Sequence, residues 1–300
     1  MRPTPSNIPA SRAARLAGML LGVGLIGLLL VRLARLWHDH PVPLDDANWP
    51  LLILALAGSA LAMAAYGAVW PLTLRALGTE PPRGLLACFF AGQLGKYLPG
   101  GAWQYVGRAA LARRLGVPLQ FAAGSLVLEA VCSLVAAALV ASFLLADDGW
   151  GLAYPLVVLV VSAAALAWAS RLAFVRRFVA DRRSLGAAAG SYLAVFILFG
   201  LAFWLTADAL YDVAAADLSW YIGSYAAAWA AGFVVVFAPG GLGVREAVLV
   251  ALLRGRLGES EAIVLAAASR IAFTLVDLAG GSVALFALRR RPAQRQEARF

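Results

Sequence analysis

The sequence predicts an all-α polytopic membrane protein with about six full transmembrane helices and two broken, re-entrant helical hairpins in an inverted-topology repeat. Composition is the first reason, because 62% of the 300 residues are hydrophobic and only 14% are charged. The second is a series of apolar runs, such as "LAGMLLGVGLIGLLLV", that suit a hydrocarbon core about 30 Å thick. The third is a Pro-Gly-Gly tripeptide that occurs twice, 140 positions apart.

Six apolar segments predict full spans. They are residues 15–36, 50–74, 119–145, 153–170, 186–209 and 262–288. The first follows two arginines, as a signal peptide does, but it lacks a small-residue cleavage site, so we interpret it as a retained anchor. All six belong to a single transmembrane domain that occupies residues 1–300.

The distribution of charge predicts the orientation. Basic clusters at the span ends fall on one side of the membrane if the N-terminus is cytoplasmic, and acidic loops such as "WHDHPVPLDDANW" then fall outside. We therefore expect a multi-pass plasma membrane protein with both termini in the cytoplasm and a basic tail at 289–300.

The formal net charge of +9 does not indicate a nucleic-acid partner, because the arginines lie at span ends and in short loops, where they attract anionic lipid headgroups. Cys88 and Cys132 fall inside hydrophobic segments, and the two histidines share a short loop. We predict no metal site, no cofactor and no disulfide framework.

Two shorter apolar segments, 84–98 and 102–115, predict the first hairpin. Fifteen helical residues reach roughly 22 Å, less than a bilayer core of about 30 Å. Pro99 blocks continuation of the helix, and Gly100 and Gly101 let the backbone reverse. A helix that enters, breaks and returns therefore fits better than two full crossings.

The pattern recurs in the second half of the chain. "AGQLGKYLPGGAWQYVGRAALARR", from Ala91, aligns without gaps with "AGFVVVFAPGGLGVREAVLVALLR", from Ala231, which contains Pro239, Gly240 and Gly241. The flanking spans also align, so the repeat units are 50–145 and 186–288. An odd number of spans separates the hairpins, so they enter from opposite sides. The alternative is that each Pro-Gly-Gly is a tight loop between ordinary spans.

Inverted repeats with broken helices occur in many transporters, which bind substrate near the midplane of the bilayer. The N-terminus of a half-helix offers free N–H groups and the positive end of a dipole. Such a site suits an anion, for example a lipid phosphate.

Three charges lie within predicted spans: Glu129, Arg270 and Asp277. A charge near a helix centre costs roughly 2.5 to 3.5 kcal/mol, so these side chains should face the bundle interior, pair, or line a polar path. They form either a substrate or proton path, or a structural Glu129–Arg270 or Arg270–Asp277 pair.

Three more charges lie beside the helix breaks. Lys96 ends a half-helix, where a cation complements the dipole, attracts an anionic headgroup or extends to the interface. Glu246 suits the first turn of the following helix, whereas Arg245 opposes the dipole, which an anion ligand would explain. The predicted substrate-binding residues are Lys96, Gly100, Gly101, Glu129, Gly240, Gly241, Arg245, Glu246, Arg270 and Asp277, with helix breaks at Pro99 and Pro239.

At "YLPGGAWQYVGRAALARRLGVP" and "FAPGGLGVREAVLVALL" the chain resembles the lysylphosphatidylglycerol synthase transmembrane-region family of flippase-like integral membrane proteins. The resemblance extends roughly from Arg15 to Arg290. The second family motif, close to Pro-Gly-Gly-x-Gly-x-Arg-Glu, is matched by Pro239, Gly240, Gly241, Gly243, Arg245 and Glu246. Many members carry a Glu-Arg…Asp pattern after the first motif, of which only Glu129 is kept in "EAVCSL".

The resemblance implies a domain that flips an aminoacylated phospholipid made by a separate soluble domain. That synthase half is not expected here, and no Gly-x-Ser-x-Gly, Walker or His-Glu-x-x-His motif predicts an enzyme. We expect a flippase for a phospholipid or a polyprenyl-phosphate-type lipid, with membrane lipids and a lipid-synthesising enzyme as partners. The alternatives are a membrane-embedded lipid-modifying enzyme, a glycosyltransferase-associated subunit, and a structural scaffold.

Overall fold

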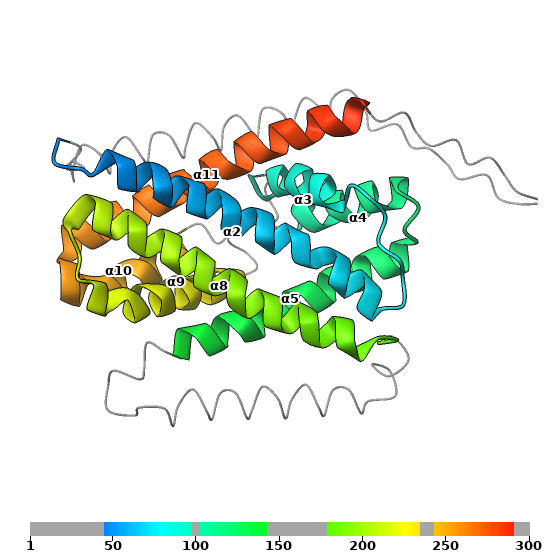
Figure 1. Cartoon of the computed structure of the whole chain (residues 1–300), viewed down its shortest axis with the longest axis horizontal. Helices are drawn as coiled ribbons and strands as arrows, with labels where there is room; N and C mark the ends of the chain where they lie inside the picture. The colour runs from blue at the N-terminus through cyan, green and yellow to red at the C-terminus, as the bar shows by residue number, and fades with distance from the viewer. Residues whose placement is uncertain (1–44, 98–101, 143–178, 235–242, 291–300) are drawn as a thin grey trace, which may run out of the picture.

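The computed structural model describes residues 45–97, 102–142, 179–234 and 243–290, and within these ranges all regular secondary structure is helical (Figure 1). The α-helices are α2 (Trp49–Ala76), α3 (Leu85–Gln93), α4 (Trp103–Arg114), α5 (Leu119–Ala141), α8 (Arg182–Tyr211), α9 (Leu218–Val234), α10 (Val244–Leu257) and α11 (Glu259–Arg290). Two short 3₁₀ helices, η1 (Leu94–Tyr97) and η3 (Ala215–Asp217), continue α3 and precede α9. The all-α prediction is thus confirmed for the described residues.

Four of these helices, α2, α5, α8 and α11, are long and apolar enough to cross a membrane. They coincide with the predicted spans at 50–74, 119–145, 186–209 and 262–288. The predicted spans at 15–36 and 153–170 lie outside the described residues. Exposed side chains on the four helices include large apolar ones, such as Ile53, Val127, Ile197 and Val283. An apolar outer face of this kind is typical of helices that contact lipid.

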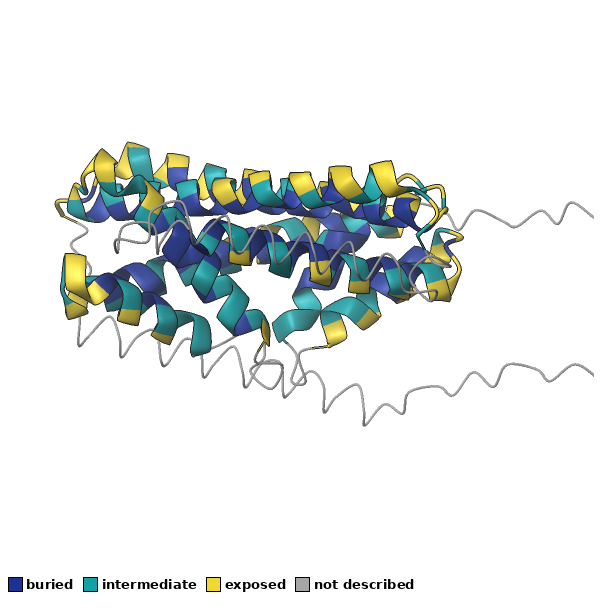
Figure 2. Ribbon diagram, turned by 90° about the horizontal axis from the view of Figure 1, so that it is seen from below, coloured by how far each residue is buried: buried dark blue, intermediate teal, exposed yellow. Residues whose placement is uncertain are grey.

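Helices α2 and α8 lie antiparallel and side by side (Figure 1) and pack along their length. The Asn48 N–H donates to the Ala209 carbonyl (2.9 Å) at one end of the pair, and the Ala180 N–H donates to the Ala76 carbonyl (2.8 Å) at the other. Between these ends, the Tyr66 and Tyr192 rings meet at 5.1 Å between centroids. The buried residues face the inside of the bundle, and the exposed ones lie on its outer faces (Figure 2).

The short helices form two pairs, which we call the first hairpin (α3, η1 and α4) and the second hairpin (α9 and α10). The first hairpin extends inward from one end of the bundle and the second from the opposite end (Figure 1). Helix α4 rises only about 18 Å over its 12 residues and α9 about 26 Å over its 17. Both are shorter than a hydrocarbon core of about 30 Å.

The packing of the hairpins follows a reciprocal pattern. The first hairpin contacts α11 through α3 and α5 through α4, whereas the second contacts α5 through α9 and α11 through α10. Each hairpin therefore packs against the long helix that follows it and against the long helix that follows the other hairpin. Both prolines and all four glycines of the Pro-Gly-Gly motifs lie outside the described residues.

Close approach of α8 to α9 depends on a glycine. A Cβ atom at Gly200 would lie 2.5 Å from the Ile222 Cα and 2.8 Å from its Cβ. Backbone atoms cannot move aside as a flexible side chain can, so Gly200 sets the distance between these two helices.

We predict that Gly200→Ala lowers the thermal unfolding temperature of the detergent-purified protein. The added methyl group would force the helices apart, and overpacking of this kind costs about 1–3 kcal/mol. The matched controls are Gly186→Ala and Gly190→Ala in the same helix, where a Cβ would meet nothing within 4 Å. They should be neutral or slightly stabilising, because alanine favours helix more than glycine does. Equal unfolding temperatures for all three variants would contradict the assigned α8–α9 packing.

Candidate functional site

A cavity of about 290 Å³ lies between the two hairpins and is lined by residues from both. From the first hairpin it is lined by Gln93, Lys96, Tyr97, Ala102, Gln104, Tyr105 and Arg108, and from the second by Tyr225, Trp229, Gly232, Phe233 and Arg245. The long helices contribute Met63, Glu129, Phe199, Arg270, Phe273, Thr274 and Asp277. Residues on both sides of each Pro-Gly-Gly sequence therefore face one common space.

The described lining carries an excess of positive charge. Four of its side chains are basic, namely Lys96, Arg108, Arg245 and Arg270, and two are acidic, namely Glu129 and Asp277. Charges in a low-dielectric interior interact more strongly than in water and are costly without partners. The pairing of these six groups thus decides what the cavity can bind.

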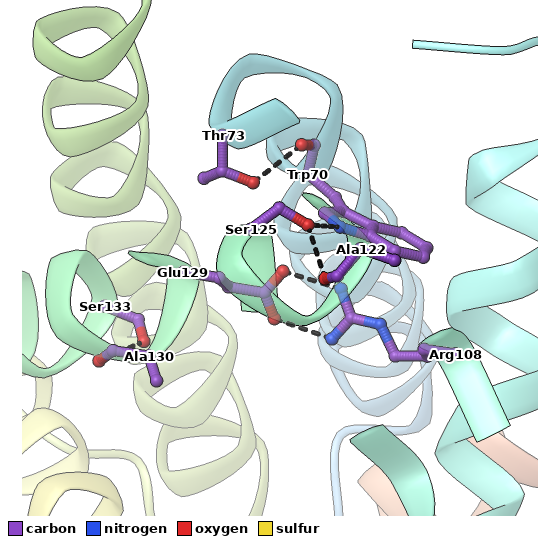
Figure 3. Close-up of polar contacts among 8 residues, drawn as sticks. All are labelled: Trp70, Thr73, Arg108, Ala122, Ser125, Glu129, Ala130 and Ser133. Atoms are coloured by element: carbon purple, nitrogen blue, oxygen red, sulfur yellow. Dashed lines mark hydrogen bonds and ion pairs between the residues drawn. The ribbon is translucent and has the colours of Figure 1, made fainter. Parts of the chain in front are cut away.

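The first charge pair joins α4 to α5. Both terminal nitrogens of Arg108 donate to the two carboxylate oxygens of Glu129, each at 2.6 Å (Figure 3). Arg108 is 2% exposed and Glu129 1%. The guanidinium also lies over the rings of Trp70 (4.3 Å) and Phe89 (4.9 Å). Bidentate, charge-assisted geometry and aromatic faces together offset the desolvation of the pair.

A polar contact on α2 supports this pair from the side. The Trp70 indole N–H donates to the Ser125 hydroxyl at 2.9 Å, and Ser125 donates to the Ala122 carbonyl (Figure 3). Ser125 lies one helical turn before Glu129, so the same hydrogen bond that anchors the indole under Arg108 also joins α2 to α5. The Arg108 guanidinium is therefore held by the Glu129 carboxylate and by the Trp70 ring.

A glycine makes room for the Arg108 side chain. A Cβ at Gly92 would lie 2.3 Å from the Arg108 Cγ and 3.1 Å from the Gln104 carbonyl oxygen. Helix α3 can approach α4 this closely only because position 92 has no side chain.

The second charge pair joins the inner end of the first hairpin to α11. The Lys96 ammonium forms an ion pair with Oδ2 of Asp277, and the Tyr97 hydroxyl donates to the same oxygen at 2.9 Å. Asp277 is fully buried. Its other oxygen, Oδ1, has no hydrogen-bond partner within the described part of the chain.

The third group of charges lies where α10 begins. Oε2 of Glu246 accepts from the Gly243 N–H at 2.7 Å, which caps the helix, and Oε1 lies 3.8 Å from Nε of Arg270. Beside it, the Arg245 guanidinium lies over the rings of Tyr225 (4.3 Å) and Phe273 (5.3 Å). Nη2 of Arg245 is buried and has no hydrogen-bond partner among the described residues.

The structure brings most of the predicted charged residues together. Lys96, Glu129, Arg245, Arg270 and Asp277 line the cavity, and Glu246 contacts Arg270 at its edge. The predicted Pro99, Gly100, Gly101, Pro239, Gly240 and Gly241 lie outside the described residues. Their role as helix breaks and substrate contacts therefore stays a prediction.

A Glu129–Arg270 pair was one of the structural alternatives, but the cation that donates to both oxygens of Glu129 is Arg108. Lys96, for which a dipole, headgroup or interfacial role was predicted, is instead the ion-pair partner of Asp277. Sequence reasoning had no means of choosing between partners on helices that are far apart in the chain.

Arg108 and Tyr97 were not predicted as site residues. Arg108 is the only cation of the short segment 102–112, before the Arg113-Arg114 cluster. A buried carboxylate such as Glu129 needs a cation nearby, so an intramembrane arginine in the adjacent segment was an available signal. No comparable signal distinguishes Tyr97.

Within the described ranges, no group of three or more histidine, cysteine, aspartate or glutamate side chains is placed to hold a metal ion. The arrangement offers ion pairs, a surplus of arginine donors and, among the described residues, two carboxylate oxygens without a hydrogen-bond partner, Oδ1 of Asp277 in the cavity lining and Oε1 of Glu246. These groups can bind a polar or charged ligand inside an apolar domain.

The fold and the cavity define an α-helical integral membrane protein with a charged internal site formed by two opposed helical hairpins. The chain belongs to the family described as the lysylphosphatidylglycerol synthase TM region, which matches residues 16–281. This match confirms the family that the two Pro-Gly-Gly motifs predicted. A search of curated proteins finds no match.

We predict that Arg108→Met lowers the unfolding temperature strongly, because it leaves the Glu129 charge buried and unpaired. Removal of one partner of a buried pair costs about 3–5 kcal/mol, whereas replacement of both by apolar residues is often neutral. The double variant Arg108→Met/Glu129→Leu should therefore be more stable than Arg108→Met alone.

The control for this prediction is Arg256→Met, which removes the same charge from a pair with Asp217 that is about one-third exposed. Exposed pairs contribute about 0–1 kcal/mol, so this variant should unfold near the wild-type temperature. Thermal unfolding in detergent measures all three. If Arg108→Met and Arg256→Met are equally stable, the Arg108–Glu129 pair does not have the assigned structural role.

Proposed function

We propose that the protein is a lipid transporter that moves a phosphate-bearing lipid headgroup across the plasma membrane by way of the cavity between the two hairpins. The observation that carries the proposal is Arg245. Its guanidinium lies in a basic cavity, yet Nη2 is buried and has no hydrogen-bond partner among the described residues. Buried donors need acceptors, and a phosphate oxygen is the acceptor that arginine matches best.

The charge balance of the lining favours an anion. Arg108 is neutralised by Glu129 and Lys96 by Asp277, so the excess positive charge of the lining resides on the side of Arg245 and Arg270. Glu246 lies on the same side, with Oε1 3.8 Å from Nε of Arg270, so two cations there face one carboxylate. A phosphate that binds beside Arg245 adds the negative charge that this side lacks.

The size of the cavity supports a headgroup rather than a whole lipid. Pockets for small molecules measure roughly 300–1,000 Å³, and the 290 Å³ found here lies just below this range. A phosphate with a small polar substituent fits this space, whereas two acyl chains do not. The tails of the lipid therefore remain in the surrounding bilayer, and phospholipids and polyprenyl phosphates meet this requirement equally.

The reciprocal packing of the hairpins supports transport through an inverted repeat. The two hairpins point inward from opposite ends of the bundle, and each packs against both α5 and α11 (Figure 1). In transporters with inverted repeats, rocking of one unit against the other opens a central site to each side in turn. We extend this scheme to the chain, with re-entrant hairpins, cytoplasmic termini and a lipid-synthesising enzyme as a functional partner.

We predict that Arg245→Ala reduces lipid exchange between leaflets at least about tenfold, the effect of losing one charge-assisted contact to the headgroup. The measurement uses purified protein in liposomes that contain tail-labelled phosphatidylglycerol, with chemical quenching of the label in the outer leaflet. Arg245→Lys should recover part of the rate, because it restores the charge without the planar fork.

The matched control is Arg256→Ala. Arg256 lies on the same helix and over an aromatic ring, Trp220 at 4.2 Å, but it does not line the cavity. It should exchange lipid at the wild-type rate. A folded Arg245→Ala protein that exchanges lipid as fast as Arg256→Ala would overturn the proposal.

The same liposomes distinguish transport from the enzymatic alternative. Chromatography of the extracted lipids after the reaction reveals any chemically altered product. Exchange without a new lipid species supports a transporter, whereas a protein-dependent new species would show a lipid-modifying enzyme instead.

A further inference from the structure

The open carboxylate oxygen of Asp277 is the feature of the cavity that an anion ligand does not explain. Asp277 is fully buried and lines the cavity, and its Oδ1 atom is without a hydrogen-bond partner among the described residues. A bound phosphate would repel this oxygen. Its presence within the same small cavity as Arg245 therefore needs a ligand with a second chemical group.

The two hydrogen-bond donors that contact Asp277 both interact with its other carboxylate oxygen, Oδ2. Both the Lys96 ammonium and the Tyr97 hydroxyl interact with Oδ2. Thr274, one turn earlier on α11, also lines the cavity, and no hydrogen bond joins it to Oδ1. One side of the carboxylate is thus held by the first hairpin, and the other is left open to the cavity.

A buried carboxylate oxygen that has left water requires a hydrogen-bond donor in exchange. An ammonium or a hydroxyl group can supply one, whereas an ester oxygen or a quaternary ammonium cannot, because neither carries an N–H or O–H bond. Oδ1 of Asp277 therefore favours ligands that carry N–H or O–H donors over ligands that carry none.

We propose that the cavity selects phospholipids whose headgroup carries an N–H or O–H donor beside the phosphate, with the phosphate at Arg245 and the donor at Oδ1 of Asp277. This inference rests on the proposed transport of a phosphate-bearing lipid and adds the class of headgroup. Arg245 and Asp277 line the same cavity of about 290 Å³, so the arginine donor and the carboxylate acceptor face one small space. Asp277 is then a specificity-determining residue.

Competition binding to the purified wild-type protein, followed by native mass spectrometry, tests this selection. The first set of probes is phosphatidylethanolamine, its N-methyl and N,N-dimethyl forms, and phosphatidylcholine, with equal acyl chains. All four headgroups are zwitterionic, but the number of N–H donors falls along the series to none. The second set compares phosphatidylglycerol with phosphatidylmethanol, which are both anionic and differ in hydroxyl groups.

We predict that phosphatidylcholine binds about tenfold more weakly than phosphatidylethanolamine, and phosphatidylmethanol more weakly than phosphatidylglycerol. A tenfold change is the size expected when one hydrogen bond to a charged group is lost. A preference in the first set alone identifies ammonium as the donor, and a preference in the second set alone identifies hydroxyl. Equal affinities within both sets would overturn the inference and indicate that water occupies the site at Oδ1.

Asp277→Asn tests whether the selection arises at this residue. Asparagine keeps the shape of the side chain, but its amide nitrogen can turn a donor toward the cavity, where it opposes a donor of the ligand. The variant should bind all members of each set with similar affinity. The control is Asp217→Asn, the same substitution at an ion-paired aspartate that does not line the cavity, and it should keep the wild-type preference.

The design separates failure of this inference from failure of the proposed function. If no lipid binds in a manner that depends on Arg245, the transport proposal itself is wrong. If binding depends on Arg245 but the affinities are equal within both sets of lipids, only the role of Asp277 is wrong. The wild-type lipid series needs no variant, so the inference can be refuted even if Asp277→Asn does not fold.

Discussion

A charge inside a bilayer must have a partner, and the structure depends on how this requirement is met. The bidentate Arg108–Glu129 pair is the most complete solution, because both carboxylate oxygens are satisfied and two aromatic rings cover the guanidinium. It attaches α4 to α5, and the absence of a side chain at Gly92 lets α3 approach the same place. The first hairpin is thereby held in the bundle by a contact that lipid cannot replace.

Helix α11 connects the two hairpins through its own charges. Asp277 reaches the inner end of the first hairpin through Lys96 and Tyr97, and Arg270 reaches the start of α10 through Glu246. Seven residues separate these two positions, which is about two helical turns, so both lie on one face of the helix. A rearrangement of either hairpin must therefore change contacts on α11.

Much of the fold could be predicted from sequence because bilayer thickness and hydrophobicity act on continuous segments. The four described spans, the short helices beside each Pro-Gly-Gly and the inward position of Glu129, Arg270 and Asp277 all follow from that rule. The pairing of the charged side chains could not be predicted from sequence in the same way. Arg108 and Glu129 are 21 positions apart and Lys96 and Asp277 are 181 apart, and no period in the sequence relates such distant side chains.

The sequence by itself determined a membrane-embedded helical protein, its family and the set of charges that must avoid lipid, since these depend on composition and local motif. Only the tertiary structure decided which charge meets which. Helix packing sends Lys96 to Asp277 and Arg108 to Glu129, and it leaves a donor of Arg245 and an oxygen of Asp277 open within one cavity. Ion pairs form over a few ångströms in space, so their partners are chosen only when the helices come together.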